Sequence, residues 1–445
     1  MPHVAFVPFT GFRIREAEML ELGMTLPGFQ QRAQAIAQLP ALGLLTLAGM
    51  TPSPWTCSYH EASFWNDGLV EKILQEQPDL VAISALTASV EEAYRFSAAL
   101  RRHRLRVVLG GLHATACPEE ARQHVDAVVI GEGEPVWPRI LADTLSGTLQ
   151  PVYRAEAAFD LARAPVPRFD FLAGRQPARF TLQTQRGCPL ACEFCGASRL
   201  LGPFREKPLA NISEELNAIA KIRPAPLLEL ADDNTFAGSR DFAPLLEKLA
   251  DSGARFFTEV DWRIGMRPEL LSALAASGCV QVLVGIESLV YHHSGMGPKL
   301  AEWCRIQEAL TAIQEAGIAV IGCFIVGADG ETRQSLDRLG QIILDWDLAD
   351  VQITIQTPFP GTPLFRRLQK QGRLLPERGW SFYTLFDVTY LPDQMSVAEL
   401  ETGFRNLVRE VFAGPAAARR NAFRKRIWGA NPRLRPWAFE HSPAI

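Results

Sequence analysis

The sequence lacks the features that mark membrane and secreted proteins. It has no run of about 18 uninterrupted apolar residues, so no membrane-spanning helix is expected. Residues 1–7 contain no basic stretch followed by a long apolar core, and they predict a first strand rather than a signal peptide. Five of the eight cysteines stand singly, at positions 57, 117, 279, 304 and 323, which is typical of a reducing compartment and not of a disulfide framework. We therefore expect a cytoplasmic protein.

A strong excess of basic residues is also absent. The 445 residues include 45 Lys and Arg against 49 Asp and Glu, and the net charge of −4 argues against nucleic acid as a general partner. The length exceeds that of a single hydrophobic core, so two or three domains are expected. The hydrophobic fraction of 47% is ordinary for a globular protein.

Residues 1–148 alternate between short apolar runs and amphipathic stretches. This alternation predicts a Rossmann-like α/β domain with a parallel, doubly wound sheet. The predicted strands lie at residues 4–8, 56–60, 80–84, 106–109 and 127–130, and the predicted helices begin near residues 42, 68, 90 and 118. Ligands of such sheets bind beyond the carboxyl ends of the strands, where glycines let the backbone approach a ligand closely. The candidate ligand segments are therefore residues 84–87, 110–113 and 131–134.

The dinucleotide-binding pattern GxGxxG does not follow the first predicted strand, which argues against a dinucleotide cofactor. The domain instead resembles the cobalamin-binding domain, through Ser84 and Leu86 followed by the pair Gly110 and Gly111. The segments GGLHATACPEEA and DAVVIGEGE resemble, more specifically, the cobalamin domain attached to radical S-adenosylmethionine (SAM) enzymes. The resemblance implies that cobalamin contacts Ser84, Leu86, Thr87, Gly110, Gly111, His113, Gly131, Glu132, Gly133 and Glu134.

The Asp-x-His-x-x-Gly loop of other cobalamin proteins is absent, since residues 38–43 read QLPALG. A histidine ligand to cobalt from that loop is therefore not expected, and His60 and His113 remain as substitutes. Each of them has a simpler interpretation as a pocket histidine with ordinary hydrogen bonds. The domain could also keep its glycines for turns and bind nothing. The related methylthiotransferases place three cysteines in their N-terminal domain, whereas this domain has only Cys57 and Cys117.

Residues 149–178 are rich in proline and predict an ordered connector. Residues 179–375 then resume the alternation, with six predicted strands at residues 180–184, 226–231, 255–260, 280–284, 318–326 and 351–356. Six strand–helix units predict a partial (β/α)6 barrel of the TIM type rather than a closed eightfold one. Polar residues and glycines gather at the carboxyl ends of these strands, where such barrels build their sites.

Three cysteines lie close together after the first of these strands, as Cys188, Cys192 and Cys195 in a CxxxCxxC pattern. Three thiolates on one loop can converge on a metal, because soft sulfur favours iron–sulfur clusters or zinc. The count of three is informative, since a catalytic metal keeps one coordination position open. The spacing alone leaves both an iron–sulfur cluster and a zinc site with a distant fourth ligand open.

The barrel region resembles the radical SAM superfamily over nearly its whole length. The cysteine loop and the segments DDNTF, GIES, FIVG and TPFPGTPL occur in the order of that family. The resemblance implies a [4Fe-4S] cluster on Cys188, Cys192 and Cys195, with SAM on the open iron. It further implies that SAM contacts Asp232, Asp233, Glu287, Ser288, Ile325, Val326 and Gly327. In simpler alternatives, the two aspartates cap the next helix, and Glu287 pairs with a base such as Arg263 or Lys299.

Residues 376–445 predict a mainly helical C-terminal segment, with Ser396 as the N-cap of a helix that ends near residue 412. The final stretch is basic and interleaved with Phe423, Trp428 and Trp437. Such a segment could make peripheral contact with an anionic membrane or a lipid substrate. The commoner structure is a solvated face whose aromatic residues anchor on the barrel.

Together the resemblances imply a cobalamin-dependent radical SAM enzyme of the class B methyltransferase type, with no individual catalytic residue assigned. In that family, SAM is split to a 5′-deoxyadenosyl radical, and methylcobalamin delivers a methyl group to a substrate carbon. We therefore expect methyl transfer to an unactivated carbon of a small-molecule or lipid-like substrate, with an electron donor such as flavodoxin or ferredoxin. Radical cyclisation, rearrangement or oxidation without methyl transfer is one alternative, and a non-catalytic cobalamin or cluster sensor is another.

Overall fold

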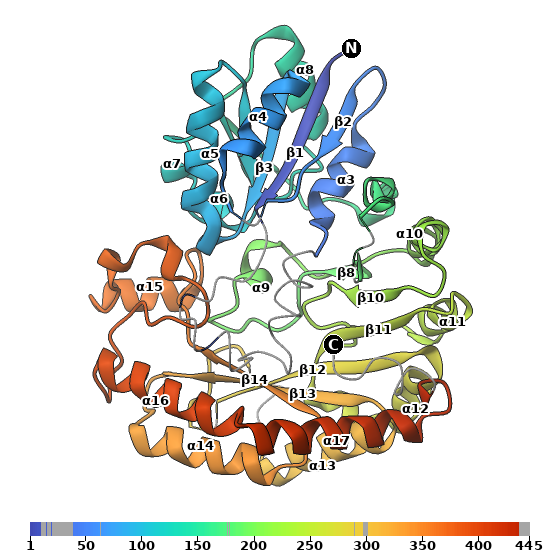
Figure 1. Cartoon of the computed structure of the whole chain (residues 1–445), viewed down its shortest axis with the longest axis vertical. Helices are drawn as coiled ribbons and strands as arrows, with labels where there is room; N and C mark the ends of the chain where they lie inside the picture. The colour runs from blue at the N-terminus through green and yellow to red at the C-terminus, as the bar shows by residue number, and fades with distance from the viewer. Residues whose placement is uncertain are drawn as a thin grey trace.

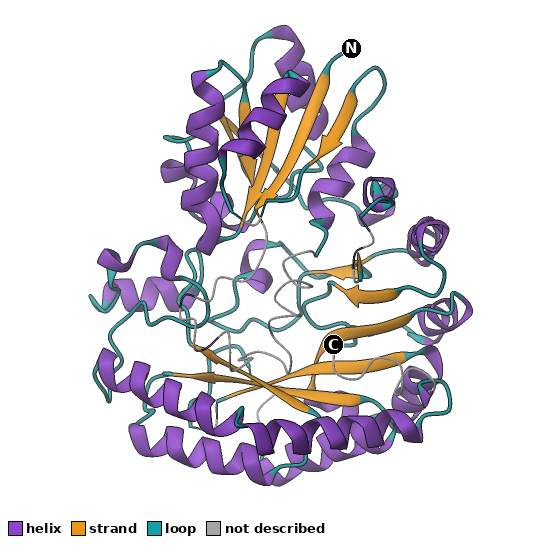
Figure 2. Ribbon diagram, in the orientation of Figure 1, coloured by secondary structure: helices purple, strands orange, loops and turns teal. Residues whose placement is uncertain are grey.

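The computed structural model describes residues 1–9, 15, 19, 39–62, 64–175, 177, 179–288, 290–296 and 301–435. Within them the protein contains two parallel six-stranded sheets, one near the N-terminus and one from the middle of the chain (Figure 1). Helices flank both sheets, and further helices follow the second one (Figure 2). This architecture confirms the predicted Rossmann-like domain, partial barrel and helical C-terminal segment.

The first sheet has its strands in an order that is typical of doubly wound folds. They are β1 (His3–Phe9), β2 (Thr56–Tyr59), β3 (Leu80–Ala85), β4 (Val107–Gly110), β5 (Ala127–Ile130) and β6 (Val152–Arg154). They pair in parallel in the order β2-β1-β3-β4-β5-β6. The chain changes direction across the sheet between β1 and β3. Ligands of such sheets bind outside the carboxyl ends of the strands near that point.

Alternate residues of β1 enter two different hydrophobic cores, because successive side chains of a strand point to opposite faces. Val4 and Phe6 pack in the core that contains residues of α3 (Leu42–Met50) and α8 (Trp137–Ser146). Ala5 and Val7 pack in the core that contains residues of α4 (Asp67–Glu76) and α5 (Val90–Arg102). Burial on both faces explains why the strands are continuous apolar runs.

Strand β6 lies inside the stretch for which the prolines predicted only a connector. Its residues pair in parallel with β5, from Val128 beside Val152 to Ile130 beside Arg154. Tyr153 is buried, and its hydroxyl donates to Asp143 at 2.7 Å, which ties the strand to α8. The first sheet therefore extends beyond residue 148, where β6 is held by its backbone pairing with β5 and by the buried Tyr153.

The second sheet forms the partial barrel. Its strands are β7 (Phe180–Leu182), β10 (Leu227–Leu230), β11 (Arg255–Asp261), β12 (Cys279–Glu287), β13 (Ala319–Val326) and β14 (Asp350–Ile355). They pair in parallel in chain order. The helices between them are α10 (Leu209–Ile222), α11 (Ala243–Asp251), α12 (Pro268–Ser277), α13 (Trp303–Glu315) and α14 (Arg333–Asp345). All six predicted strands of the barrel are thus present.

Up to residue 435, where the description ends, three α-helices follow the barrel, namely α15 (Pro363–Lys370), α16 (Val397–Val411) and α17 (Gly414–Ala430). Ser396 caps α16 as predicted, in a reciprocal arrangement with Glu399. In α17, the Trp428 indole donates to the Val280 carbonyl at 2.7 Å, and Arg424 pairs with the buried Asp350 at 3.2 Å. The aromatic and basic residues of α17 therefore anchor on the barrel; Trp437 lies outside the described residues.

No helix in the described ranges is long and apolar enough to cross a membrane.

Candidate functional site

The first of two cavities lies between the two sheets and has a volume of about 300 Å³. On the side of the first sheet it is lined by the ends of β3, β4 and β5 and by α3. On the barrel side it is lined by residues of the cysteine-loop region and of the first barrel strands. Of the residues predicted to contact cobalamin, those that line it are Ser84, Gly110, Gly111, Gly131, Glu132, Gly133 and Glu134.

Glycine is required at one position of this cavity wall. Gly111 has a φ of +105°, and a Cβ there would lie 3.1 Å from Ser84 Oγ and 3.4 Å from the Ala85 carbonyl oxygen. Any larger residue would be strained and would fill the space above the end of β3. The residues present thus fit a cofactor whose flat surface or chain approaches the backbone closely.

Three of the predicted cobalamin contacts lie outside this cavity. Leu86 has 54% of its surface exposed, and Thr87 is buried at the start of the turn η1 (Thr87–Ser89). His113 is buried on α6 (Leu112–Ala116), where its Nε2 lies 3.4 Å from Glu120 Oε1 and its ring packs against Trp380. The other candidate histidine, His60, also lies away from the cavity.

The alternative histidine, His60, is held by an acidic neighbour. Its Nε2 lies 2.9 Å from Glu76 Oε1, at the end of α4. Both His60 and His113 therefore make ordinary polar contacts in this structure, as their simpler interpretation expects. The acidic neighbour of His113 is Glu120, on α7 (Pro118–Ala121). Its carboxylate also accepts hydrogen bonds from Tyr94 and Trp380, and so it ties the first domain to the segment after α15.

An ion cluster joins the two domains at the rim of the first cavity. Arg186, two residues before Cys188, donates to Glu132 and, at 2.7 Å, to Glu134. Arg205 donates to Glu132 as well. The side chains of Arg186, Glu132 and Glu134 are 12%, 9% and 7% exposed. Burial disfavours the guanidinium, but the two carboxylates outweigh it and raise the pKa of Arg186 above its ordinary value. We call these three residues the inter-domain clasp.

The second cavity lies at the carboxyl ends of the barrel strands and also has a volume of about 300 Å³. All three predicted ligands, Cys188, Cys192 and Cys195, line it. Burial raises the pKa of the Cys195 thiol, while Ser198, whose amide lies 3.4 Å from the sulfur, acts in the opposite direction. Three thiols on one cavity fit an iron–sulfur cluster that leaves one iron open.

No three His, Cys, Asp or Glu side chains within the described ranges are spaced to hold one metal ion. A cluster does not require three side chains that converge on a single metal ion, because each of its thiolates binds a separate iron.

The predicted SAM contacts divide into two groups. Asp233, Glu287 and Ile325 line the second cavity. Burial, and secondly the neighbouring Asp232, raise the pKa of Asp233 to about 6. Glu287 stands at the end of β12 with a φ of +69°, an uncommon conformation for a residue other than glycine. Backbone strain of this kind occurs where a structure holds a side chain toward a ligand.

The other group lies outside the second cavity. The Asp232 carboxylate is buried and accepts from the backbone amides of Thr184 and Gln185, at 2.8 and 3.0 Å, so it fixes the start of the cysteine loop. The Ser288 hydroxyl donates to Glu331, whose carboxylate also accepts from the Gly327 amide. Val326 is buried in the core at the end of β13.

The cavity also contains residues that no motif had marked. They include Glu259 on β11, Gln352 and Thr354 on β14 and Leu385 in the segment before α16. Glu259 lies between the buried Thr258 and Val260 on its strand, and this alternation is the signal that could have found it. Leu385 has a φ of +77° and its carbonyl accepts from the Ile355 amide at 2.7 Å, but no local pattern predicts that this segment returns to the barrel.

Two family models match separate parts of the chain. Residues 33–141 match the B12 binding domain, and residues 182–342 match the Radical SAM superfamily. The bacteriochlorophyllide d C-12(1)-methyltransferase of Chlorobaculum tepidum is 26% identical over 379 residues, which cover 81% of each chain. The anaerobic magnesium-protoporphyrin IX monomethyl ester cyclase of Cereibacter sphaeroides is 25% identical over 78% of this chain and 62% of its own length.

Solved structures show the same fold. The cobalamin-dependent S-adenosylmethionine radical enzyme OxsB, with aqua-cobalamin bound, superposes with a TM-score of 0.70 at 14% identity, over 99% of this chain and 71% of OxsB. Fold and cavities thus define an α/β enzyme in which a B12-type sheet faces a radical SAM barrel. The chain belongs to the cobalamin-binding radical SAM enzymes, whose cofactors are cobalamin, SAM and a [4Fe-4S] cluster.

Proposed function

We propose that the protein is a methyltransferase that acts on an unactivated carbon of a small-molecule or lipid-like substrate. The observation that carries the proposal is the wall between the two cavities. The short helix α9 (Ala197–Leu200) follows Cys195 and lies between the two sheets (Figure 1). Ser198 faces the cavity of the cysteines, whereas Leu200 and Leu201 face the inter-domain cavity. A substrate carbon beside this wall would be close to both cavities.

Each cavity has a distinct task in this proposal. When bound, the cluster with SAM supplies the radical chemistry, and cobalamin supplies the methyl group. Cys188, Cys192 and Cys195 would hold the cluster, and Asp233 and Glu287 would accept hydrogen bonds from the ammonium and ribose groups of SAM. Gly110, Gly111 and the segment 131–134 would border cobalamin. The apolar side chains of α9 and α3 would exclude water from the space between them.

The domain division supports the same proposal. We propose a cobalamin domain at residues 1–148, a connector at 149–178, a radical SAM barrel at 179–375 and a helical segment at 376–445. The connector contributes β6 to the first sheet. The electron donor, such as flavodoxin or ferredoxin, and a cytoplasmic location belong to the proposal as well.

A radical cyclisation or oxidation without methyl transfer is the second candidate. The similarity to a relative named as a cyclase favours it, because that protein shares about the same identity as the named methyltransferase. The two candidates require the same cofactors and the same cavities. They differ in their products, since only methyl transfer consumes a second SAM as a methyl source.

The test uses the full chain, reconstituted anaerobically with iron, sulfide and cobalamin and then supplied with SAM and a reductant. We expect 5′-deoxyadenosine and S-adenosylhomocysteine to form together. Formation of 5′-deoxyadenosine alone, in the presence of a substrate that changes mass, would favour cyclisation or oxidation. If neither compound forms, the sensor alternative gains support. A purified and reconstituted protein that retains no cobalamin would refute the two-cofactor proposal.

A further inference from the structure

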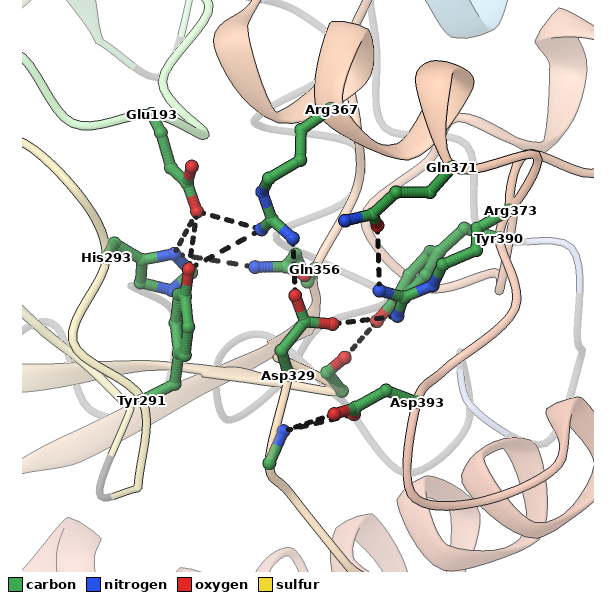
Figure 3. A network of polar contacts seen from close by, with 12 residues as sticks. Glu193, Tyr291, His293, Asp329, Gln356, Arg367, Gln371, Arg373, Tyr390 and Asp393 are labelled. Carbon is green, nitrogen blue, oxygen red and sulfur yellow. Dashed lines mark hydrogen bonds and ion pairs between the residues drawn. The ribbon is translucent and has the colours of Figure 1, made fainter.

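A buried carboxylate sits inside the cysteine loop and takes no part in lining either cavity. Glu193 lies between Cys192 and Cys195 in the chain, and its side chain points into a polar network (Figure 3). The Tyr291 hydroxyl donates to Glu193 Oε1 at 2.8 Å, and Arg367 Nη2 donates to the same oxygen at 3.0 Å. His293 Nδ1 lies 3.8 Å from it.

The backbone of the cysteine loop is held by the same neighbours. The Glu193 amide donates to the Ser294 carbonyl at 2.9 Å, and the Leu364 amide at the start of α15 donates to the Glu193 carbonyl at 3.1 Å. Gly295 packs so closely on the loop that a Cβ there would overlap the Ala191 carbonyl. The segment 291–296 and α15 therefore support the loop from behind.

The charges of the network alternate. Arg367 bridges Glu193 and Asp329, and Asp329 also accepts from Arg373 at 2.7 Å (Figure 3). Glu193, Arg367, Asp329 and Arg373 thus form a chain of two negative and two positive charges that leads away from the cysteine loop. The chain is only partly exposed at its loop end, so solvent screens the first two charges incompletely.

We propose that Glu193 and Arg367 are positioning residues that hold the cysteine loop and set the reduction potential of the cluster. The charges next to a cluster shift its potential, because reduction adds a negative charge to it. Glu193 disfavours the reduced cluster and Arg367 favours it, and their mutual pairing holds the two effects in balance. The inference rests on the cluster that family membership implies, and it is independent of whether a methyl group is transferred.

The opposite charges of the pair predict opposite effects. Glu193→Gln keeps the size and a hydrogen-bonding oxygen but removes the negative charge, so the midpoint potential of the cluster is expected to rise. Arg367→Met keeps the length and removes the positive charge, so the potential is expected to fall. The double variant should return toward the wild-type value. A purely structural role would move both potentials in the same direction, or would change only the amount of bound iron.

Two controls separate charge from packing. Tyr291→Phe removes a hydrogen bond to Glu193 without changing a charge, and we expect a smaller shift than in either charge variant. Arg366→Met removes a neighbouring but exposed arginine, whose guanidinium donates to the Gly361 carbonyl, and we expect a wild-type potential. Iron per chain is measured for every variant, so that loss of the loop geometry is detected separately from a shift in potential.

The measurement is a redox titration of the full, reconstituted chain, followed by electron paramagnetic resonance of the reduced cluster. Opposite shifts in Glu193→Gln and Arg367→Met, with Arg366→Met unchanged, are the expected result. Shifts of the same sign, no shift in either, or loss of iron from both while Tyr291→Phe retains it, would overturn the electrostatic role. A wild-type chain that binds no cluster would instead refute the proposed function, and a titratable cluster without methyl transfer would leave this inference intact.

Discussion

The inter-domain clasp allows a quantitative prediction for Arg186→Met. The substitution leaves Glu132 paired with Arg205 but removes from Glu134 the guanidinium that donates to it, while both carboxylates stay largely buried. Removing one partner of a buried ion pair typically destabilises a protein by about 3–5 kcal/mol, because the remaining charge is left uncompensated. We therefore expect a loss of that order in the free energy of unfolding, caused by the weakened contact between the domains.

The expected loss can be converted into a melting temperature. An unfolding entropy of about 2.1 cal/mol/K per residue, applied to 445 residues, gives a shift of about 1 °C per kcal/mol if the chain unfolds as one unit. Arg186→Met should therefore melt about 3–5 °C below the wild type, measured by calorimetry without added cofactors. Cobalamin retained per chain should fall as well, since Glu132 and Glu134 line the first cavity.

The matched control is Arg122→Met, which breaks an exposed ion pair with Glu119 on the first domain. Exposed pairs contribute about 0–1 kcal/mol, so its melting temperature should stay within about 1 °C of the wild type. The double variant Arg186→Met with Glu134→Gln should recover part of the loss, because it removes the uncompensated charge. A melting temperature of Arg186→Met equal to that of the control would refute the reasoning.

Three further predictions concern the two cavities, and a fourth concerns the buried Glu331. Gly111→Ala should lower the affinity for cobalamin by about tenfold or more, equivalent to ~1.4 kcal/mol, measured by equilibrium dialysis, because the added methyl group meets Ser84 and Ala85. Cys188→Ala, Cys192→Ala and Cys195→Ala should each lose most cluster iron and all formation of 5′-deoxyadenosine; near wild-type iron in any of them would contradict the ligand assignment. SAM affinity should fall as the pH drops through about 6, where Asp233 becomes protonated and stops accepting from an ammonium, and Asp233→Asn should be flat with pH. Burial raises the pKa of Glu331 to about 7, so its ionisation costs stability as the pH rises from its ordinary value of 4.5 to about 7; Glu331→Gln should remove that slope in denaturant titrations.

The fold could be predicted because apolar periodicity records burial on both faces of each strand. The six strands of the barrel and the N-cap at Ser396 were all predicted and are present. The edge strand β6 was missed, since three residues carry too little periodicity beside several prolines. Helix α15 was not predicted either; Pro363 stands at its start, where proline is tolerated.

The candidate site was predictable where one loop or one strand end carries it. Cys188, Cys192 and Cys195 are close in the chain, and they share one cavity. The adjacent Asp232 and Asp233 show the limit, because successive residues after a strand point in different directions. Only Asp233 faces the cavity, while Asp232 accepts hydrogen bonds from two backbone amides at the start of the cysteine loop. The clasp joins residues more than fifty positions apart, so no local pattern announces it.

The central claim is that this chain transfers a methyl group from SAM to carbon by using both cofactors. The most direct measurement is anaerobic turnover with SAM that carries deuterium in its methyl group, followed by mass spectrometry of the substrate. The account predicts a product that carries the deuterated methyl group, with one 5′-deoxyadenosine and one S-adenosylhomocysteine per product, and none without cobalamin. A product formed without the label, or formed equally well without cobalamin, would contradict it.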